Sequence, residues 1–281
     1  MILNRFYVDE LIKTAICEDI HYVDVTTDYL IDENAETTAK FVSKADGVVC
    51  GLEIALRVFT LLDDRITFEV FKKDGDEVKK GELICKMRGN TRALLKGERT
   101  ALNLIQHMSG IATATHHCVK LVEGTNASVV DTRKTLPGLR PLQKYAVTCG
   151  GGKNHRYNLS DAAMLKDNHI DAYGGITAAV EALRKKAGHM VKIEVETRTL
   201  DDLREALAVG ADIIMLDNMD HDTMAEAIGI IDGRAEIEIS GNVDEAKVEM
   251  IRDLKVDYVS SGALTHSSPI LDLSLKNMRR I

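Results

Sequence analysis

The hydrophobic and polar positions of the chain change their rhythm near residue 125. Before that point, apolar residues recur at helical spacing over 9–16, 52–62 and 91–122, and alternate with polar residues over 36–50, 66–70 and 83–87. We expect the longest helical pattern to break at Ser109-Gly110 and to form a hinge there. The order helix, strand, helix, strand, strand predicts an N-terminal α+β sandwich domain.

After residue 125, short apolar strands alternate with helices. Strands are predicted at 128–131, 162–166, 191–196, 213–217, 235–240 and 258–260, and helices at 176–186, 200–209, 223–230 and 244–254. Repeated β-α units with apolar strands are typical of a parallel sheet, and this many in succession favour a closed or nearly closed barrel. A doubly wound open sheet is the alternative. The strands are followed by no glycine-rich dinucleotide motif, so no nicotinamide cofactor is expected.

Composition narrows the class of protein. The 281 residues, 45% hydrophobic and 28% charged, suit a globular protein of one large or two ordinary domains. A net charge of −8 without long Lys/Arg runs argues against nucleic-acid binding. We expect no membrane association, because no apolar run could cross a bilayer and no signal peptide is recognisable. Five widely spaced cysteines predict reduced thiols in a cytoplasmic protein rather than a disulfide framework or a zinc site.

The segment from Asp131 to His169 is basic although the chain is acidic. It carries a net charge of +4, which leaves −12 on the remaining residues. Such a segment attracts anions, and its cations follow no helical period, which favours a binding site over a solvated helix face. The candidate residues are Arg133, Lys134, Arg140, Lys144, Lys153, His155, Arg156, Lys166 and His169.

Each predicted barrel strand ends in residues that can bind a charged or polar ligand. Cations follow the first two strands, carboxylates the next two and Ser-Gly turns the last two. The carboxyl ends of barrel strands share one face, so these residues should converge there. Ser-Gly turns suit a phosphate, Glu196 and Asp217 suit Mg²⁺ or ribose hydroxyls, and arginines grip carboxylates bidentately. Glu194 shares a face with Glu196, or is only a neighbour inside the barrel. The pattern predicts a ligand that combines a sugar phosphate with a carboxylate.

A series of motifs then points to a family. In chain order they are GERTALN, SGIATAT, DTRKTLPGLR, GGGKNHR, KDNHI, EVE, LDN, SG and SSGALTHS. The series resembles the quinolinate phosphoribosyltransferases (nicotinate-nucleotide pyrophosphorylase, carboxylating) over nearly the whole chain, most densely between 97 and 266. The resemblance implies an α/β protein with an N-terminal α+β sandwich domain (1–110, with 268–281 as a candidate addition). A seven-stranded TIM-like α/β barrel (111–267) would follow, although only six barrel strands can be counted. It also implies a homodimer or a higher homo-oligomer.

The resemblance implies roles for individual residues. The pyridine dicarboxylate would be held by Arg133, His155, Arg156 and Arg99, the last reaching in from the partner subunit. The catalytic residues would be Lys134, Lys166, Glu196 and Asp217, of which the two acids would hold ribose hydroxyls and the Mg²⁺–pyrophosphate of phosphoribosyl pyrophosphate. The 5′-phosphate would be held by Ser240, Gly241, Gly262 and His266. The family often has a second glycine where this chain has Asn242. The implied reaction gives nicotinate mononucleotide, CO₂ and pyrophosphate in de novo NAD biosynthesis.

Three alternatives stay open at this point. A barrel lyase could use Lys134 or Lys166 as a Schiff-base amine. A paralogue of the same fold could act on another anionic ring. The phrase KDGDEVKKGELI resembles the turn of biotinyl and lipoyl carrier domains, but its nearest lysine, Lys86, lies within an alternating strand rather than at a hairpin tip.

Overall fold

A computed structural model describes residues 3–280 and divides them into two compact units. Unit 1 comprises residues 3–116, 137–151 and 268–280, and unit 2 comprises 117–136 and 152–267. The predicted domain division at residue 110 stays a prediction, and the position itself falls inside the long helix α4 (Thr91–Leu121). The helices of the described residues include no candidate for a membrane span.

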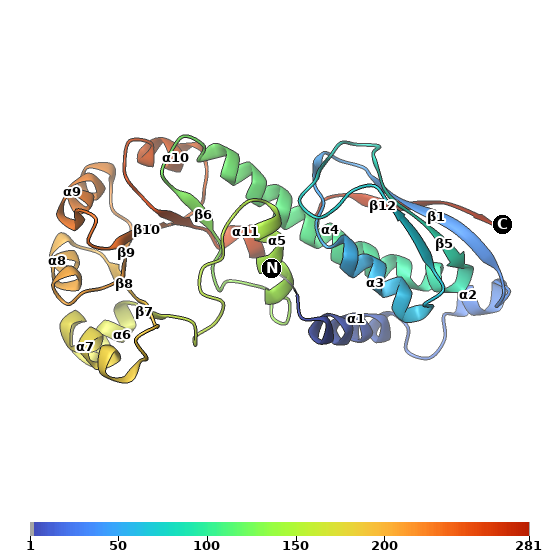
Figure 1. The fold of residues 1–281 in the computed structure, drawn as a ribbon, viewed down its shortest axis with the longest axis horizontal. Helices are drawn as coiled ribbons and strands as arrows, with labels where there is room; N and C mark the ends of the chain where they lie inside the picture. Colours follow the sequence, from blue (N-terminus) through green and yellow to red (C-terminus); the bar gives the residue numbers. More distant parts are fainter. Residues whose placement is uncertain (1–2, 281) are drawn as a thin grey trace. The chain divides into compact units, whose positions relative to one another are not determined.

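Unit 1 is built on a four-stranded antiparallel sheet with the order β12-β1-β5-β3. The strands are β1 (Glu36–Ser43), β3 (Thr67–Val70), β5 (Leu83–Asn90) and β12 (Leu273–Arg280). Alternate residues of β1 are buried, as a strand with one covered face requires. Phe41 of β1 packs against Phe59 of α3 (Leu52–Leu62), with ring centroids 6.1 Å apart. Figure 1 shows α3 and α4 beside this sheet.

The remaining elements of unit 1 are short or lie at its periphery. They are α1 (Arg5–Asp19), α2 (Val25–Leu30), β2 (Gly47–Val48), β4 (Glu77–Val78) and α5 (Arg140–Cys149). The KDGDEVKKGELI segment forms the turn before β4 and β4 itself, which pairs with β2. Lys86 lies within β5, opposite Lys40 of β1 and Glu69 of β3. Because a carrier lysine needs a hairpin tip, this position speaks against the carrier alternative.

The predicted break at Ser109-Gly110 is wrong, because α4 runs through it without interruption. The Ser109 hydroxyl accepts a hydrogen bond from the Cys50 amide (2.9 Å) and donates one to the Cys50 carbonyl (3.1 Å). A Cβ on Gly110 would lie 2.0 Å from the carbonyl oxygen of Pro269. The two small residues therefore admit close neighbours to the helix surface; they do not end the helix.

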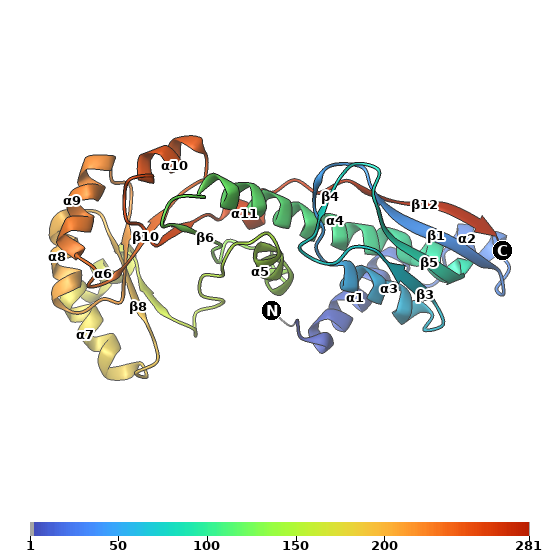
Figure 2. The same cartoon turned by 45° about the horizontal axis from the view of Figure 1, so that its top comes forward.

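Unit 2 contains a six-stranded parallel sheet with the order β6-β11-β10-β9-β8-β7. Its strands are β6 (Ser128–Val130), β7 (Ala163–Leu165), β8 (Ile193–Thr197), β9 (Ile213–Leu216), β10 (Glu236–Ser240) and β11 (Tyr258–Ser260). All six predicted strands are present, and the sheet is consistent with the expected barrel. Figure 2 shows α7 (Ile176–Lys186), α8 (Leu200–Ala208), α9 (His221–Ile231) and α10 (Glu245–Ile251) on the outside of the sheet. The other helices of unit 2 are α6 (Asp167–Tyr173) and α11 (Ala263–His266).

A single residue, Lys153, pairs with the free edge of β6, whereas the seventh strand that the resemblance implies could not be placed from the sequence. Lys153 forms a parallel bridge with Val130: its amide donates to Val129 O (2.9 Å), and its carbonyl accepts from the Asp131 amide (3.2 Å). The surrounding sequence GGGKNHR has no alternating apolar positions, so hydrophobic patterning could not reveal this contact. The bridge brings the segment that carries His155 and Arg156 alongside β6.

Candidate active site

A cavity of about 500 Å³ opens at the carboxyl ends of the strands of unit 2. All residues to which the family resemblance gives a role, except Arg99, line it. The full lining consists of Thr132, Arg133, Lys134, His155, Arg156, Met164, Lys166, Glu196, Met215, Asp217, Glu238, Ser240, Gly241, Asn242, Ser260, Gly262, Ala263 and His266. The convergence follows from the parallel sheet, in which every strand delivers its last residues to the same face.

Opposite charges face each other across β7 and β8. Lys166 follows β7 and Glu196 lies in β8, and the lysine Nζ is 3.0 Å from Glu196 Oε2. The lysine side chain is 48% exposed and the glutamate side chain 12%. Asp217 follows the next strand, β9, and completes a row of one cation and two carboxylates on neighbouring strands. This part of the cavity can bind hydroxyl groups and balance the charge of an anion.

Another group of lining residues combines small residues with a second lysine. A Cβ on Gly262 would lie 2.7 Å from Lys134 Cδ and 3.2 Å from His266 Nε2, so glycine lets these side chains come close. The Thr265 hydroxyl donates to the Lys134 carbonyl (2.8 Å) and fixes the backbone of that residue. Ser240 is the last residue of β10, Gly241 follows it, and both line the same cavity. Hydroxyl, amide and cationic groups together suit a phosphate.

A buried charge cluster supports His155. Its Nε2 lies 3.1 Å from Glu194 Oε2 and 3.3 Å from Glu238 Oε2, and the glutamate side chains are only 3% and 2% exposed. Burial alone would lower the pKa of His155, but hydrogen bonds to both carboxylates and their charges raise it from 6.5 to about 9. The Arg156 amide, 2.8 Å from His155 Nδ1, favours the neutral ring instead. The carboxylates thus favour the protonated ring, whereas the amide favours the neutral one.

The same cluster affects the neighbouring ionisable groups. Burial raises the pKa of Glu194, and the adjacent His155 partly opposes this effect. Burial and the nearby Arg133 lower the pKa of Arg156 from its usual high value. The guanidinium groups of Arg133 and Arg156 and the imidazole of His155 line the same cavity. Such a group is suited to a ligand with more than one carboxylate.

The basic segment contributes only part of its cations to the cavity. Arg140 and Lys144 lie on α5 in unit 1, where Lys144 is fully buried. Lys153 and His169 belong to unit 2 but do not line the cavity. Arg99 is an exposed residue of α4 in unit 1. The interpretation of the whole segment as one site was too broad, because α5 interrupts it.

The sequence interpretation missed Glu238, which lines the cavity from β10. The sequence contained an indication of this position, because EIEIS places glutamates at alternate positions of an otherwise apolar strand. The sequence left two roles open for Glu194, a site residue or only a neighbour inside the barrel. In the structure, Glu194 is the second carboxylate beside His155.

The fold and cavity together define a class: an α/β-barrel protein whose strand ends are arranged for a phosphorylated, carboxylated ligand. Two family models match the chain, the C-terminal domain of quinolinate phosphoribosyl transferase over residues 111–276 and its N-terminal domain over 24–109. The chain belongs to the quinolinate phosphoribosyltransferase family.

Individual relatives agree with this assignment. The probable nicotinate-nucleotide pyrophosphorylase (carboxylating) of Bacillus subtilis strain 168 is 43% identical over 273 residues, covering 97% of this chain and 94% of the relative. The protein of the same description from Synechocystis sp. is 44% identical over 275 residues, covering 97% and 93%. The crystal structure of NadC from Streptococcus pyogenes superposes with a TM-score of 0.96 at 44% identity, covering 100% of this chain and 99% of that chain.

Proposed function

We propose that this protein transfers the phosphoribosyl group of phosphoribosyl pyrophosphate to quinolinate, with decarboxylation, and gives nicotinate mononucleotide, CO₂ and pyrophosphate. This reaction is a step of de novo NAD biosynthesis. Family membership supports the proposal. The observation that carries it is the set of groups that line one cavity: cations for a dicarboxylate, lysines and carboxylates for the reacting centre, and Ser-Gly turns for a phosphate.

The dicarboxylate ring is assigned to the end with Arg133, His155 and Arg156. The two guanidinium groups offer bidentate hydrogen bonds to carboxylates, and His155, held as a cation by Glu194 and Glu238, adds a third charge. These charges compensate the two negative charges of quinolinate. They also orient the ring so that its nitrogen faces C1′ of the ribose, which is the positioning that the reaction requires.

Lys134 and Lys166 are assigned to the reacting centre. The ring nitrogen forms a bond to C1′ with its lone pair as the C1′–O bond to pyrophosphate breaks, and the lysines stabilise the negative charge on the departing oxygen. The resulting pyridinium accepts the electron pair released when the adjacent carboxylate leaves as CO₂, and a proton replaces that carboxylate. No protein nucleophile takes part, which is consistent with a cavity that mainly positions and stabilises charges.

Glu196 and Asp217 are assigned to the ribose hydroxyls and to Mg²⁺. The donor set fits the ion, because the two side chains bring hard carboxylate oxygens from neighbouring strands to one cavity. Glu196 already pairs with Lys166, so the ion would be held chiefly through pyrophosphate and water, with these acids as outer partners. Bound Mg²⁺ supplies charge neutralisation at the leaving pyrophosphate. The 5′-phosphate is assigned to Ser240, Gly241, Gly262 and His266.

Incubation of the purified protein with quinolinate, phosphoribosyl pyrophosphate and Mg²⁺ tests the proposal. We expect CO₂, pyrophosphate and nicotinate mononucleotide in equal amounts, and loss of turnover when a chelator removes Mg²⁺. Nicotinate in place of quinolinate is the matched control, because it lacks the carboxylate that leaves. Consumption of nicotinate at least as fast as quinolinate would point to a paralogous activity. A borohydride-trapped adduct on either lysine would favour the Schiff-base lyase.

We further propose a homodimer in which Arg99 of one subunit completes the site of the other. The support is the family resemblance at GERTALN and the exposed position of Arg99 on α4. Arg99→Ala and Lys166→Ala should each be nearly inactive. If Arg99 acts across the interface, a mixed dimer of the two variants has one site with both defects and one intact site.

Mixing the two inactive variants under conditions of subunit exchange should therefore restore up to about half of the activity per mixed dimer. An Arg99 that acts within its own subunit leaves one defect in each site, and no activity returns. Native mass spectrometry verifies that mixed dimers have formed. Mixed dimers without activity would refute the shared site.

A further inference from the structure

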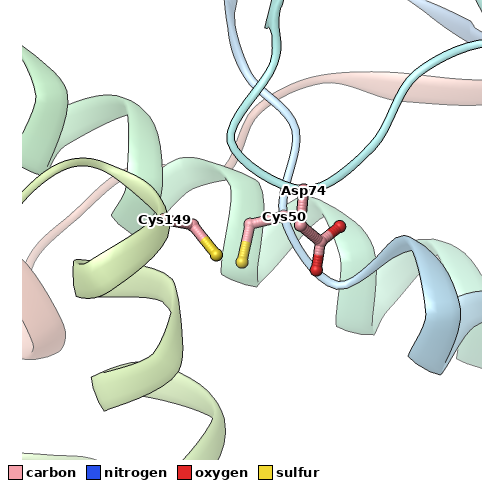
Figure 3. A group of neighbouring side chains, drawn as sticks. All are labelled: Cys50, Asp74 and Cys149. Carbon is pink, nitrogen blue, oxygen red and sulfur yellow. The ribbon is translucent and has the colours of Figure 1, made fainter. Parts of the chain in front are cut away.

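Unit 1 holds a second cluster of reactive side chains, outside the proposed active site. Cys50 precedes α3, Cys149 is the last residue of α5, and Asp74 lies in the turn before β4. The two sulfur atoms and one carboxylate oxygen all lie within 4.8 Å of one another. Figure 3 shows the two sulfur atoms pointing toward each other, with the Asp74 carboxylate on the far side of Cys50.

One face of α4 holds both cysteines in place. The Cys50 backbone is hydrogen-bonded at its amide and at its carbonyl to the Ser109 hydroxyl. The end of α5 lies directly on the next turn of α4, because a Cβ on Gly150 would be 2.4 Å from the Ala112 carbonyl oxygen. Residues three apart on a helix share a face. The approach of the two thiols is therefore fixed by packing, not by a flexible loop.

The two thiols differ in environment. Cys50 is completely buried, whereas Cys149 is half-buried. A hydrogen bond from the Cys50 thiol lowers the pKa of Cys149 despite partial burial. Burial raises the pKa of Cys50 well above its usual value. This asymmetry makes Cys149 the more acidic thiol and the nucleophile of the pair, and Cys50 its hydrogen-bond donor.

The Asp74 carboxylate is already engaged and is a poor third ligand for a metal. One of its oxygens accepts the Leu52 amide (3.0 Å), and the other accepts the Gly51 amide (3.0 Å) and the Tyr145 hydroxyl (2.9 Å). These bonds tie the start of α3 to α5. Asp74 and Tyr145 also line a cavity of about 510 Å³.

We propose that Cys50 and Cys149 are a redox-active dithiol that a small hydroperoxide converts reversibly into an intramolecular disulfide. The Cys149 thiolate attacks the peroxide: an S–O bond forms, the O–O bond breaks, and the other oxygen takes a proton from solvent and leaves as water or an alcohol. Cys149 is then a sulfenic acid. Cys50 attacks its sulfur, the S–S bond forms, and the hydroxyl leaves as water with the Cys50 proton. A bond of about 2.05 Å needs only a small movement of the two side chains.

Peptide mapping of the reduced full-length protein, titrated with hydrogen peroxide, tests this proposal. We expect two of the five thiols to disappear together, one crosslinked peptide that joins Cys50 to Cys149, and complete reversal by a dithiol reductant. Cys118→Ser is the matched control: Cys118 is also half-buried, but burial raises the pKa of its thiol, and the variant should form the same disulfide.

Single variants separate the two roles. Cys50→Ser should stop at a sulfenic acid on Cys149, which a 1,3-diketone traps, and Cys149→Ser should leave Cys50 reduced. Circular dichroism verifies that both variants are folded. Oxidation of the exposed Cys17 while Cys50 and Cys149 stay reduced would overturn the proposal. Stoichiometric zinc that is held by these two thiols and prevents their oxidation would overturn it as well.

Discussion

Replacing Glu238 with glutamine tests the buried charge cluster beneath His155. The substitution keeps the shape of the side chain and removes one of the two carboxylates within 3.3 Å of His155 Nε2. Glu194 remains as the second partner. The prediction is that His155 keeps a raised pKa, but one clearly closer to the ordinary value of 6.5.

The magnitude follows from the raised pKa. The difference between 6.5 and about 9 for His155 corresponds to roughly 3 kcal/mol between the two protonation states, at about 1.4 kcal/mol per pKa unit. If the carboxylates share this effect about equally, Glu238→Gln removes about 1–2 kcal/mol of it, which is about one pH unit. A histidine whose pKa is higher in the folded state stabilises the fold fully below its unfolded pKa, and this stabilisation is lost as the pH rises through the folded pKa.

The wild type should therefore lose up to roughly 3 kcal/mol of unfolding free energy from His155 between pH 6.5 and about 9, and the variant about half of it. Nitrogen-15 NMR of the histidine rings reports the pKa, and urea unfolding at several pH values reports the free energy. Glu236→Gln is the control, because Glu236 lies on the same strand but pairs with Lys192. A wild-type His155 that is neutral at pH 7.5, or a variant with an unchanged pKa, would refute the reasoning.

Two further predictions concern turnover and packing. Lys166→Ala, and likewise Lys134→Ala, should lower kcat by about 100-fold or more in the proposed reaction, measured as CO₂ release. Because both lysines are exposed, the melting temperature should change little. A large drop in melting temperature would indicate a structural role instead. Gly110→Ala should destabilise unit 1 by about 3 kcal/mol or more in urea unfolding, because its Cβ meets the Pro269 carbonyl at 2.0 Å. Gly229→Ala, on helix α9 with open space around the added Cβ, should be neutral or slightly stabilising, and equal effects would contradict the packing argument.

The site was largely predictable because its geometry follows from the strand order. A parallel sheet brings the ends of all its strands to one face, so charges at the ends of apolar runs, such as Glu196 and Asp217, could be assigned to one cavity from their positions alone. The same reasoning could not place Lys153, since a one-residue bridge has no hydrophobic period.

Other features depend on tertiary contacts that no local pattern encodes. Ser109 and Gly110 are weak helix formers, and only the neighbours at Cys50 and Pro269 explain why a continuous helix contains them. Cys50 and Cys149 are far apart in the sequence, so the expectation of isolated reduced thiols followed from spacing alone. Packing of both segments on α4 brings the two sulfur atoms together.

The pairing of β12 with β1 has a consequence for biosynthesis. Ser43 lies opposite Leu273, and Phe41 opposite Leu275, so the strand that completes the sheet of unit 1 follows the whole of unit 2 in the chain. While the ribosome is still making unit 2, β1 has one edge without its strand, and open edges of this kind invite pairing with other chains. The part of the protein that is translated first is thus completed only after the other unit has been made. Slow or interrupted translation of unit 2 should lengthen the time for which this edge is exposed.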